Sequence, residues 1–288
     1  MELGVFIFHS GNVKDDREGL ERKFRDVAEM GFPTCQLQIS RGEYYTEENA
    51  VAIKEIAEKY GVRISAFWCY APLNIGPIIW NIMQAPRTIG LVPPEWRAQR
   101  IEMLLRGCDF AKAMGVQDVV MHVGYVSEYP TSGEFQSLAN SLRYVAEYFK
   151  ARGQYFLFET GQETPTALLR LIETVGVDSL GINLDPSNLI TGGKGNPIDA
   201  LTVFGKYVRG VHAKDGKYPT FGYKDGVYAN GVQVPLGEGH VDYPRFIAKL
   251  REVGYDGALT IEREISGEQQ RIDIINGKKY LESILNNV

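Results

Sequence analysis

The chain has 288 residues, of which 44% are hydrophobic and 23% are charged, and both values are typical of a soluble globular protein. Its 31 basic and 36 acidic residues leave a formal net charge of −5, which gives no electrostatic reason to expect nucleic acid or an acidic membrane as a partner. No segment has the apolar length of a transmembrane helix. Three cysteines without metal-site spacing predict buried, reduced thiols in a cytoplasmic protein.

Short apolar segments recur eight times along the chain, and amphipathic stretches such as residues 46–61 and 94–115 lie between them. The predicted strands are residues 3–8, 34–39, 62–68, 116–122, 154–159, 178–185, 206–212 and 257–262. Seven glycines follow the helix-like stretches, where a residue with positive φ often ends a helix: Gly31, Gly61, Gly115, Gly153, Gly176, Gly205 and Gly254. This alternation predicts an α/β fold.

Eight strand–helix units fit one closed (β/α)8 TIM barrel that occupies residues 1–288 as a single domain. A doubly wound open sheet is the alternative fold. Two connections are longer than usual, over residues 69–93 and 213–241, and both follow predicted strands. We expect these loops to shape or cover an active site.

Four successive predicted strands, the fifth to the eighth, end on a side chain that can bind metal. These residues are Glu159, Asp185, His212 and Glu262. Any one of them could be a helix cap, a solvated strand end or a core histidine, but barrel strands converge at their carboxyl ends. Three carboxylates and one imidazole suit Mn²⁺, Mg²⁺ or Co²⁺ better than structural Zn²⁺, and we expect one divalent ion, with Mn²⁺ as first choice. One carboxylate could also serve as a base.

Five blocks in the sequence resemble the sugar phosphate isomerase/epimerase family of xylose-isomerase-like barrels. They are FLFETGQETP (156–165), LGINLDPSNLI (180–190), VRGVHAKDG (208–216), VPLGEGHVDY (234–243) and GYDGALTIEREISG (254–267). The resemblance implies that the Glu-Asp-His-Glu quartet binds the metal. It also implies that Glu159 and Glu262 act as the acid and base, as their counterparts do in the ketose 3-epimerases of the family.

The chain departs from those epimerases at three places. Asn188 replaces a histidine, Gln36 replaces a glutamate on the second strand, and Lys214 and Lys217 lie where an arginine is expected. These departures leave oxidised sugars other than free ketohexoses open as substrates.

The resemblance implies a metal-dependent isomerase or epimerase that removes a proton next to a carbonyl of a keto-sugar or related polyol, through a metal-stabilised enediolate. The alternative is a lyase or dehydratase acting on a keto-inositol or 3-keto-glycoside with the same metal and base. Its partner is then a small carbohydrate, and a homo-oligomer is possible. An endonuclease for abasic DNA is a weaker alternative, because four histidines are few for a histidine-rich metal cluster. A non-catalytic sugar-binding barrel would leave the quartet incidental.

Five further residues are candidates for substrate binding: His122, Asn188, Lys214, His9 and Trp68. The two histidines end predicted strands, and His122 is also the candidate acid for an elimination. Core histidines, a surface lysine and ordinary aromatic packing are the competing interpretations. Trp80 could line a sugar-binding wall together with Trp68.

Overall fold

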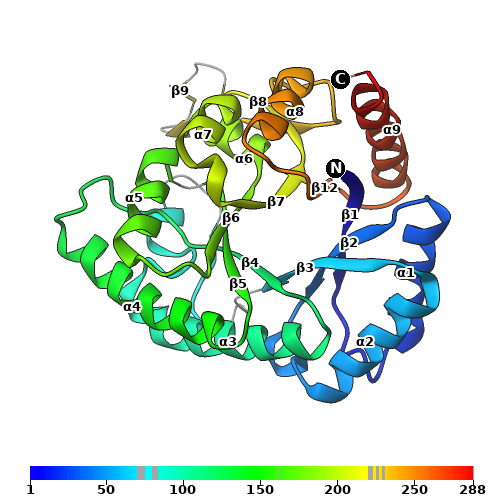
Figure 1. Cartoon of the computed structure of the whole chain (residues 1–288), viewed down its shortest axis with the longest axis horizontal. Helices are drawn as coiled ribbons and strands as arrows, with labels where there is room; N and C mark the ends of the chain where they lie inside the picture. The colour runs from blue at the N-terminus through cyan, green and yellow to red at the C-terminus, as the bar shows by residue number, and fades with distance from the viewer. Residues whose placement is uncertain are drawn as a thin grey trace.

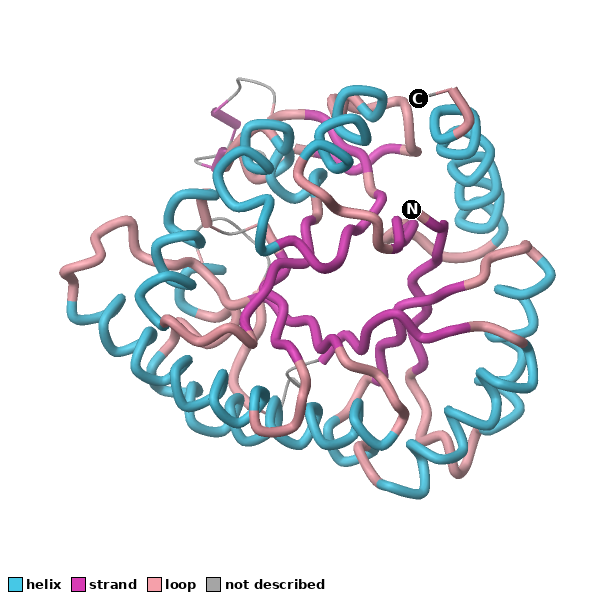
Figure 2. The backbone as a smooth tube through the Cα atoms, in the orientation of Figure 1, coloured by secondary structure: helices cyan, strands magenta, loops and turns pink. Residues whose placement is uncertain are grey.

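Eight parallel strands close into a barrel, in the order β1-β12-β7-β6-β5-β4-β3-β2 around the ring (Figures 1 and 2). The computed structural model describes residues 1–69, 75–79, 84–161, 163–219, 223–224, 227–228 and 231–287. The strands are β1 (Glu2–His9), β2 (Thr34–Ile39), β3 (Arg63–Cys69), β4 (Asp118–His122), β5 (Tyr155–Glu159), β6 (Leu180–Leu184), β7 (Val208–Ala213) and β12 (Ala258–Ile261). The predicted (β/α)8 barrel is confirmed, and closure of the sheet rules out the open alternative.

Helices follow the barrel strands and form an outer ring (Figure 2). They are α1 (Arg17–Glu29), α2 (Glu47–Tyr60), α3 (Pro94–Ala113), α4 (Gly133–Lys150), α5 (Pro165–Val175), α6 (Pro186–Thr191), α7 (Pro197–Phe204), α8 (Tyr243–Glu252) and α9 (Glu268–Leu285). Local sequence sets several of their starts. The hydroxyls of Thr46, Ser132 and Thr164 accept hydrogen bonds from the first turns of α2, α4 and α5.

The interior of the barrel is filled by a small apolar layer. Ala66, Val120 and Leu157 form this layer, separate from the large core between strands and helices. Trp68, His122 and Glu159 lie two residues farther along the same three strands, so their side chains share the inward face. The apolar layer therefore supports a polar layer above it, at the carboxyl end of the barrel.

The long connection after β7 contains two antiparallel hairpins in place of the predicted loop. The first joins β8 (Asp215–Lys217) to β11 (Val232–Val234), and the second joins β9 (Tyr223–Lys224) to β10 (Val227–Tyr228). In the other long connection a short 3-10 helix spans Ala85–Arg87, and Trp80 lies outside the described residues. Within the described segments, no helix combines the length and the apolar character needed to cross a lipid bilayer.

One of the seven glycines does not have the predicted backbone conformation. Six of them have positive φ, but Gly205 has φ −51°, so the prediction is wrong at this position. A Cβ added at Gly205 would lie 2.7 Å from Cγ1 of Val253. Close packing between the end of α7 and the end of α8, and not a left-handed turn, therefore requires glycine there.

Gly205→Ala should destabilise the protein by about 1–3 kcal/mol, because the added methyl group overpacks this contact. Val253→Ala should restore part of the loss in the double variant, since it removes Cγ1. The urea midpoint measures both effects. Gly61→Ala is the comparison: Gly61 has φ 64° with nothing within 4 Å of an added Cβ. The stability lost in Gly61→Ala comes from backbone strain, so Val253→Ala should not restore it. If Val253→Ala restored the stability of both variants equally, the packing explanation would be contradicted.

Candidate metal centre

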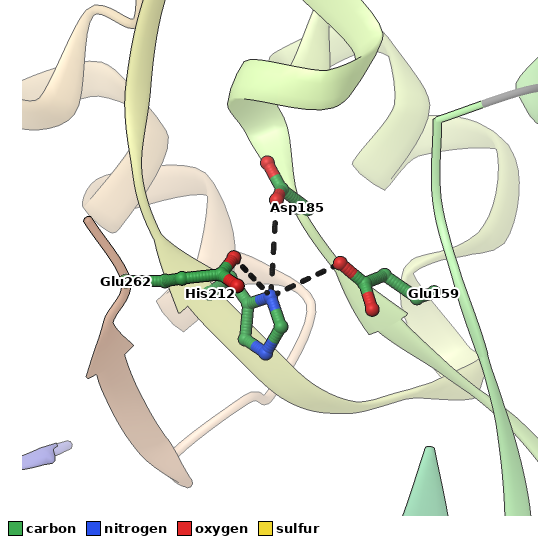
Figure 3. Close-up of side chains that lie close together, drawn as sticks. All are labelled: Glu159, Asp185, His212 and Glu262. Carbon is green, nitrogen blue, oxygen red and sulfur yellow. Dashed lines mark ion pairs between the residues drawn. The ribbon is translucent and has the colours of Figure 1, made fainter. Parts of the chain in front are cut away.

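Glu159, Asp185, His212 and Glu262 meet at the carboxyl end of the barrel (Figure 3). Glu159 ends β5, Asp185 follows β6, His212 lies near the end of β7, and Glu262 follows β12. Each offers one ligand atom, and these atoms all lie within 4.8 Å of one another. Three of the side chains are buried, and that of Glu262 is 13% exposed. The convergence expected from the strand ends is present.

His212 Nδ1 lies at the centre of the carboxylates. It is 3.1 Å from Glu262 Oε2, 3.3 Å from Glu159 Oε1 and 3.7 Å from Asp185 Oδ2. Neither His212 Nδ1 nor Asp185 Oδ2 has a hydrogen-bond partner among the described residues, although both atoms are buried. Buried polar atoms that make no hydrogen bond are costly, so two of them directed at one point fit a cation-binding centre. The set of three carboxylates and one imidazole could hold a divalent metal ion.

The Asp185 side chain is oriented so that one carboxylate oxygen caps α6 and the other faces the centre of the quartet. Its Oδ1 accepts a hydrogen bond from the backbone N–H of Asn188 at 2.9 Å, which caps α6. The hydroxyl of Thr160 accepts from the Asp185 N–H at 2.8 Å and donates to the Asp185 carbonyl at 2.9 Å. The helix cap and the side chain of Thr160 thus fix the direction of Oδ2.

Gln36 on β2 holds His212 from behind. Gln36 Oε1 lies 2.8 Å from His212 Nε2, and Gln36 Nε2 donates to Asn183 Oδ1 at 3.0 Å. An amide oxygen can only accept, so Nε2 carries a hydrogen and Nδ1 is the nitrogen that faces the carboxylates. Sequence analysis noted Gln36 only as a departure from a family pattern. Gln36 and Gln38 alternate in the apolar strand TCQLQI, which was a signal for inward-facing polar side chains.

Lys214 is directed into the metal centre and is not a surface lysine. Its side chain is 3% exposed, and Nζ lies 2.9 Å from Glu264 Oε1, 3.0 Å from Glu262 Oε2 and 3.3 Å from Asp185 Oδ2. Burial opposes its charge, but these carboxylates raise the pKa of Lys214 well above its usual value. Burial likewise opposes the charge of Glu262, yet Lys214 and His212 hold its pKa well below the usual range.

A cavity of about 550 Å³ opens directly over these residues. Trp68, His122 and Asn188 line it, as the sequence analysis expected of substrate-binding residues, and all three contact Glu159. Trp68 Nε1 donates to Glu159 Oε2, Asn188 Nδ2 lies 3.4 Å from Oε1, and His122 Nε2 lies 3.6 Å from Oε2. Sequence analysis missed further lining residues, which include Phe6, Gln38, Tyr125, Gln233 and Glu264.

His9 lies apart from this group. It ends β1 as expected, but it is buried 4.0 Å from Asp16 and is not among the described residues that line the cavity. Burial lowers the pKa of His9, which keeps it neutral. Although His9 ends a strand, its side chain does not point to the site. The interpretation of His9 as a packed core histidine therefore agrees better with the structure.

Asp215 anchors the loop that carries Lys214. This buried carboxylate accepts hydrogen bonds of 2.8–3.1 Å from the backbone N–H groups of Gly216, Gly237, Gly239 and Val241. A Cβ at Gly239 would lie 2.0 Å from Asp215 Oδ1, so glycine is needed for this close approach. The glycine-rich segment after β11 therefore folds around one charge next to the metal centre.

The xylose isomerase-like TIM barrel family matches residues 24–284 of the chain. A xylose isomerase domain protein from Planctomyces limnophilus is 28% identical, with TM-score 0.85 over 100% of this chain and 98% of that structure. The 3-keto-D-glucoside 4-epimerase of E. coli is 16% identical with TM-score 0.70, over 98% of this chain and 99% of that structure, which shows likeness of fold alone.

Four relatives were found by sequence, among them the following two. An uncharacterized protein of Methanocaldococcus jannaschii is 24% identical over 93% of this chain and 86% of its own length. An inosose dehydratase of Lacticaseibacillus casei is 24% identical over 54% of this chain and 56% of its own length. This match therefore covers about half of each protein.

Lys214→Met should raise the affinity for Mn²⁺ at least about tenfold, because it removes a positive charge from the carboxylate oxygens that face the ion. The metal-free variant should also melt at a lower temperature, since the carboxylates lose their partner. Calorimetric titration with Mn²⁺ measures the first effect and a melting curve the second. Lys217→Met, at an exposed position three residues along the chain, is the matched control. Unchanged or weaker Mn²⁺ binding in Lys214→Met would show that the Lys214 ammonium does not oppose binding of the ion.

Gln36→Leu should weaken Mn²⁺ binding by about 10–100-fold, because His212 loses the acceptor that orients its ring. Gln36→Glu keeps an acceptor in the same place and should bind Mn²⁺ at least as well as the original protein. Titration calorimetry on both variants checks this pair. Equal affinities for the leucine and glutamate variants would show that Gln36 does not orient His212.

Proposed function

Because the chain belongs to the xylose isomerase-like TIM barrel family, we propose that it is a divalent-metal-dependent isomerase or epimerase of a keto-sugar or related polyol. One observation carries the proposal. Glu159 and Glu262 approach His212 from opposite sides, at the bottom of a cavity large enough for a sugar (Figure 3). Epimerisation removes a proton from one face of a carbon and returns one to the other face, so it needs two such groups.

Both glutamates are ionised, as a group that accepts a proton must be. Burial opposes the charge of Glu159, but His122 and His212 lower its pKa, so the group stays ionised. Its two oxygens are also held by Trp68 and Asn188, which fixes the direction from which it reaches a substrate. Glu262 is ionised beside Lys214. We assign the acid and base roles to this pair.

The ion that the quartet would hold and the ammonium of Lys214 would together supply the positive charge that enolisation requires. A divalent ion held by the quartet would act as a Lewis acid toward the carbonyl and an adjacent hydroxyl of the substrate. The ammonium of Lys214 lies beside Glu262 and lines the cavity, so it can stabilise negative charge that develops on a substrate oxygen. Trp68 and His122 line the cavity beside Glu159, with ring centroids 5.9 Å apart, and we assign them to substrate binding.

A dehydratase of a keto-inositol or 3-keto-glycoside is the second candidate. Two observations favour it: Lys214 and His122 both line the cavity next to the proposed bases, and either could face a leaving hydroxyl. The partial likeness to an inosose dehydratase supports the same candidate. The epimerase is preferred because the two glutamates are paired across the centre. Manganese, a cytoplasmic location and a homo-oligomer stay predictions.

Glu262→Gln should lower solvent proton exchange on the substrate by roughly 10²-fold or more, because the amide keeps the size of the side chain but cannot act as a base. The measurement is deuterium incorporation in D₂O, followed by NMR on ketoses, keto-inositols and 3-keto-glycosides at saturating Mn²⁺. Saturation is needed because the variant also loses a metal ligand. Glu147→Gln, exposed on α4, is the control.

The same spectra separate the two candidates. The isomerase or epimerase is supported if deuterium appears at the carbon next to the carbonyl and an epimer or isomer forms. The dehydratase is supported if an unsaturated product forms. Full exchange in Glu262→Gln at saturating Mn²⁺ would remove Glu262 from the base role. Absence of exchange with every compound in the panel would count against both candidates.

A further inference from the structure

The barrel wall is lower between β12 and β1, because β12 ends earlier than β1 at the carboxyl end of the barrel. β12 ends at Ile261, which pairs with Val5, whereas β1 continues to His9 and stays paired with β2 as far as Ile39. Beyond Val5, no described strand pairs with the β12 side of β1. The backbone groups of residues 6–8 therefore form a short free edge on that side, next to Glu262.

A groove of about 840 Å³ lies outside this lowered wall, between α1 and α9. Buried apolar residues of β1 and of both helices lie along its floor: Val5, Ile7, Val27 and Ile274. The more exposed apolar lining comes from Phe6, Phe8, Met30 and Ile265. Figure 1 shows α1 and α9 on either side of β1. The segment 263–267, which leads from β12 to α9, forms one end of the groove. All of its lining residues belong to the described part of the chain.

The groove is continuous with the cavity over the metal centre. Phe6, Gln38, Glu262 and Glu264 line both spaces. Phe6 also contacts the His212 ring edge-on, with centroids 5.7 Å apart. A ligand that reacts at Glu262 can therefore extend over Phe6 and Gln38 into the groove without leaving the protein surface.

The groove carries no excess of positive charge. Its three basic residues are opposed by four acidic ones: Lys23, Arg263 and Arg271 against Asp26, Glu262, Glu264 and Glu268. Arg263 is also neutralised by Asp273 at 2.7 Å. An anionic extension, such as a phosphate, would find no excess of positive charge here.

Phe8 supplies an aromatic surface at the mouth of the groove. It pairs in register with Gln38, lines the groove and is 45% exposed, although it belongs to a barrel strand. The cavity of about 550 Å³ is already within the range of about 300–1,000 Å³ that encloses a drug-sized ligand, so a single sugar does not need the groove. An apolar floor, no excess of positive charge and an exposed ring suit a neutral, partly apolar group attached to the reacting sugar.

We propose that the groove between α1 and α9 is a subsite for the aglycone of a neutral glycoside whose oxidised sugar ring reacts at Glu262. This subsite depends on the proposed function in one respect: the proposed function places the reacting sugar ring at Glu262. The free edge of β1 offers N–H and C=O groups to the hydroxyls of a second sugar, and Phe8 offers its ring to an apolar aglycone. The substrate class is then a glycoside and not a free or phosphorylated monosaccharide.

Two probes that differ only in the aglycone test this subsite: methyl and phenyl β-D-glucopyranoside, each oxidised to the ketone at C3. Calorimetry with the Mn²⁺-supplemented protein should give at least about tenfold tighter binding of the phenyl compound. Phe8→Ala should reduce this advantage to about twofold or less and leave the methyl compound unaffected. Ser266→Trp, at an exposed position that lines the groove, should do the same by filling it.

Tyr144→Ala, which removes a 60% exposed aromatic ring on α4, is the matched control and should keep the phenyl advantage. Equal binding of the two probes, no binding of the phenyl compound, or loss of both probes in Phe8→Ala would overturn the subsite. Deuterium exchange is measured separately. If the phenyl compound binds more tightly through Phe8 but shows no deuterium exchange, the proposed function is rejected and the subsite is retained. If exchange occurs but the phenyl compound has no such advantage, the subsite is rejected and the proposed function is retained.

Discussion

Three carboxylates share a small buried volume with a single imidazole, and the arrangement of the site follows from this concentration of negative charge. Buried charges are stable only when they are paired or bind a cation. Here Lys214 pairs with Glu262 and Asp185, and His212 lies at the centre of all three carboxylates. The surrounding structure supports the cluster through Gln36 behind the imidazole.

The two halves of the barrel contribute different parts of the site. The quartet comes from β5, β6, β7 and β12 and the turns after them, whereas β1 to β4 supply Phe6, Gln38, Trp68 and His122 as walls. Lys214 contacts Glu262, whereas Trp68, His122 and Asn188 contact Glu159. One glutamate is thus paired with an ammonium, and the other is contacted by an indole, an imidazole and an amide. The early end of β12 then opens the wall on the Glu262 side alone.

Much of the fold follows from local sequence patterns. The observed strands differ from the predicted ones by no more than two residues at either end, because apolar segments and helix-ending glycines are encoded locally. The four candidate metal ligands were also visible, since each ends a strand and barrel strands converge at that end. Gly205 was misjudged because its constraint is contact with Val253, and sequence spacing does not reveal such a contact.

The sequence by itself therefore determined the barrel, the order of its elements and the four candidate metal ligands, which depend on periodicity and on strand ends. Only the tertiary structure decided which side chains share one volume. Gln36 reaches His212 across 176 residues, Lys214 turns inward, and His9 packs away from the cavity. These outcomes depend on closure of the sheet, on register and on packing around each side chain, and such long-range constraints have no local signature.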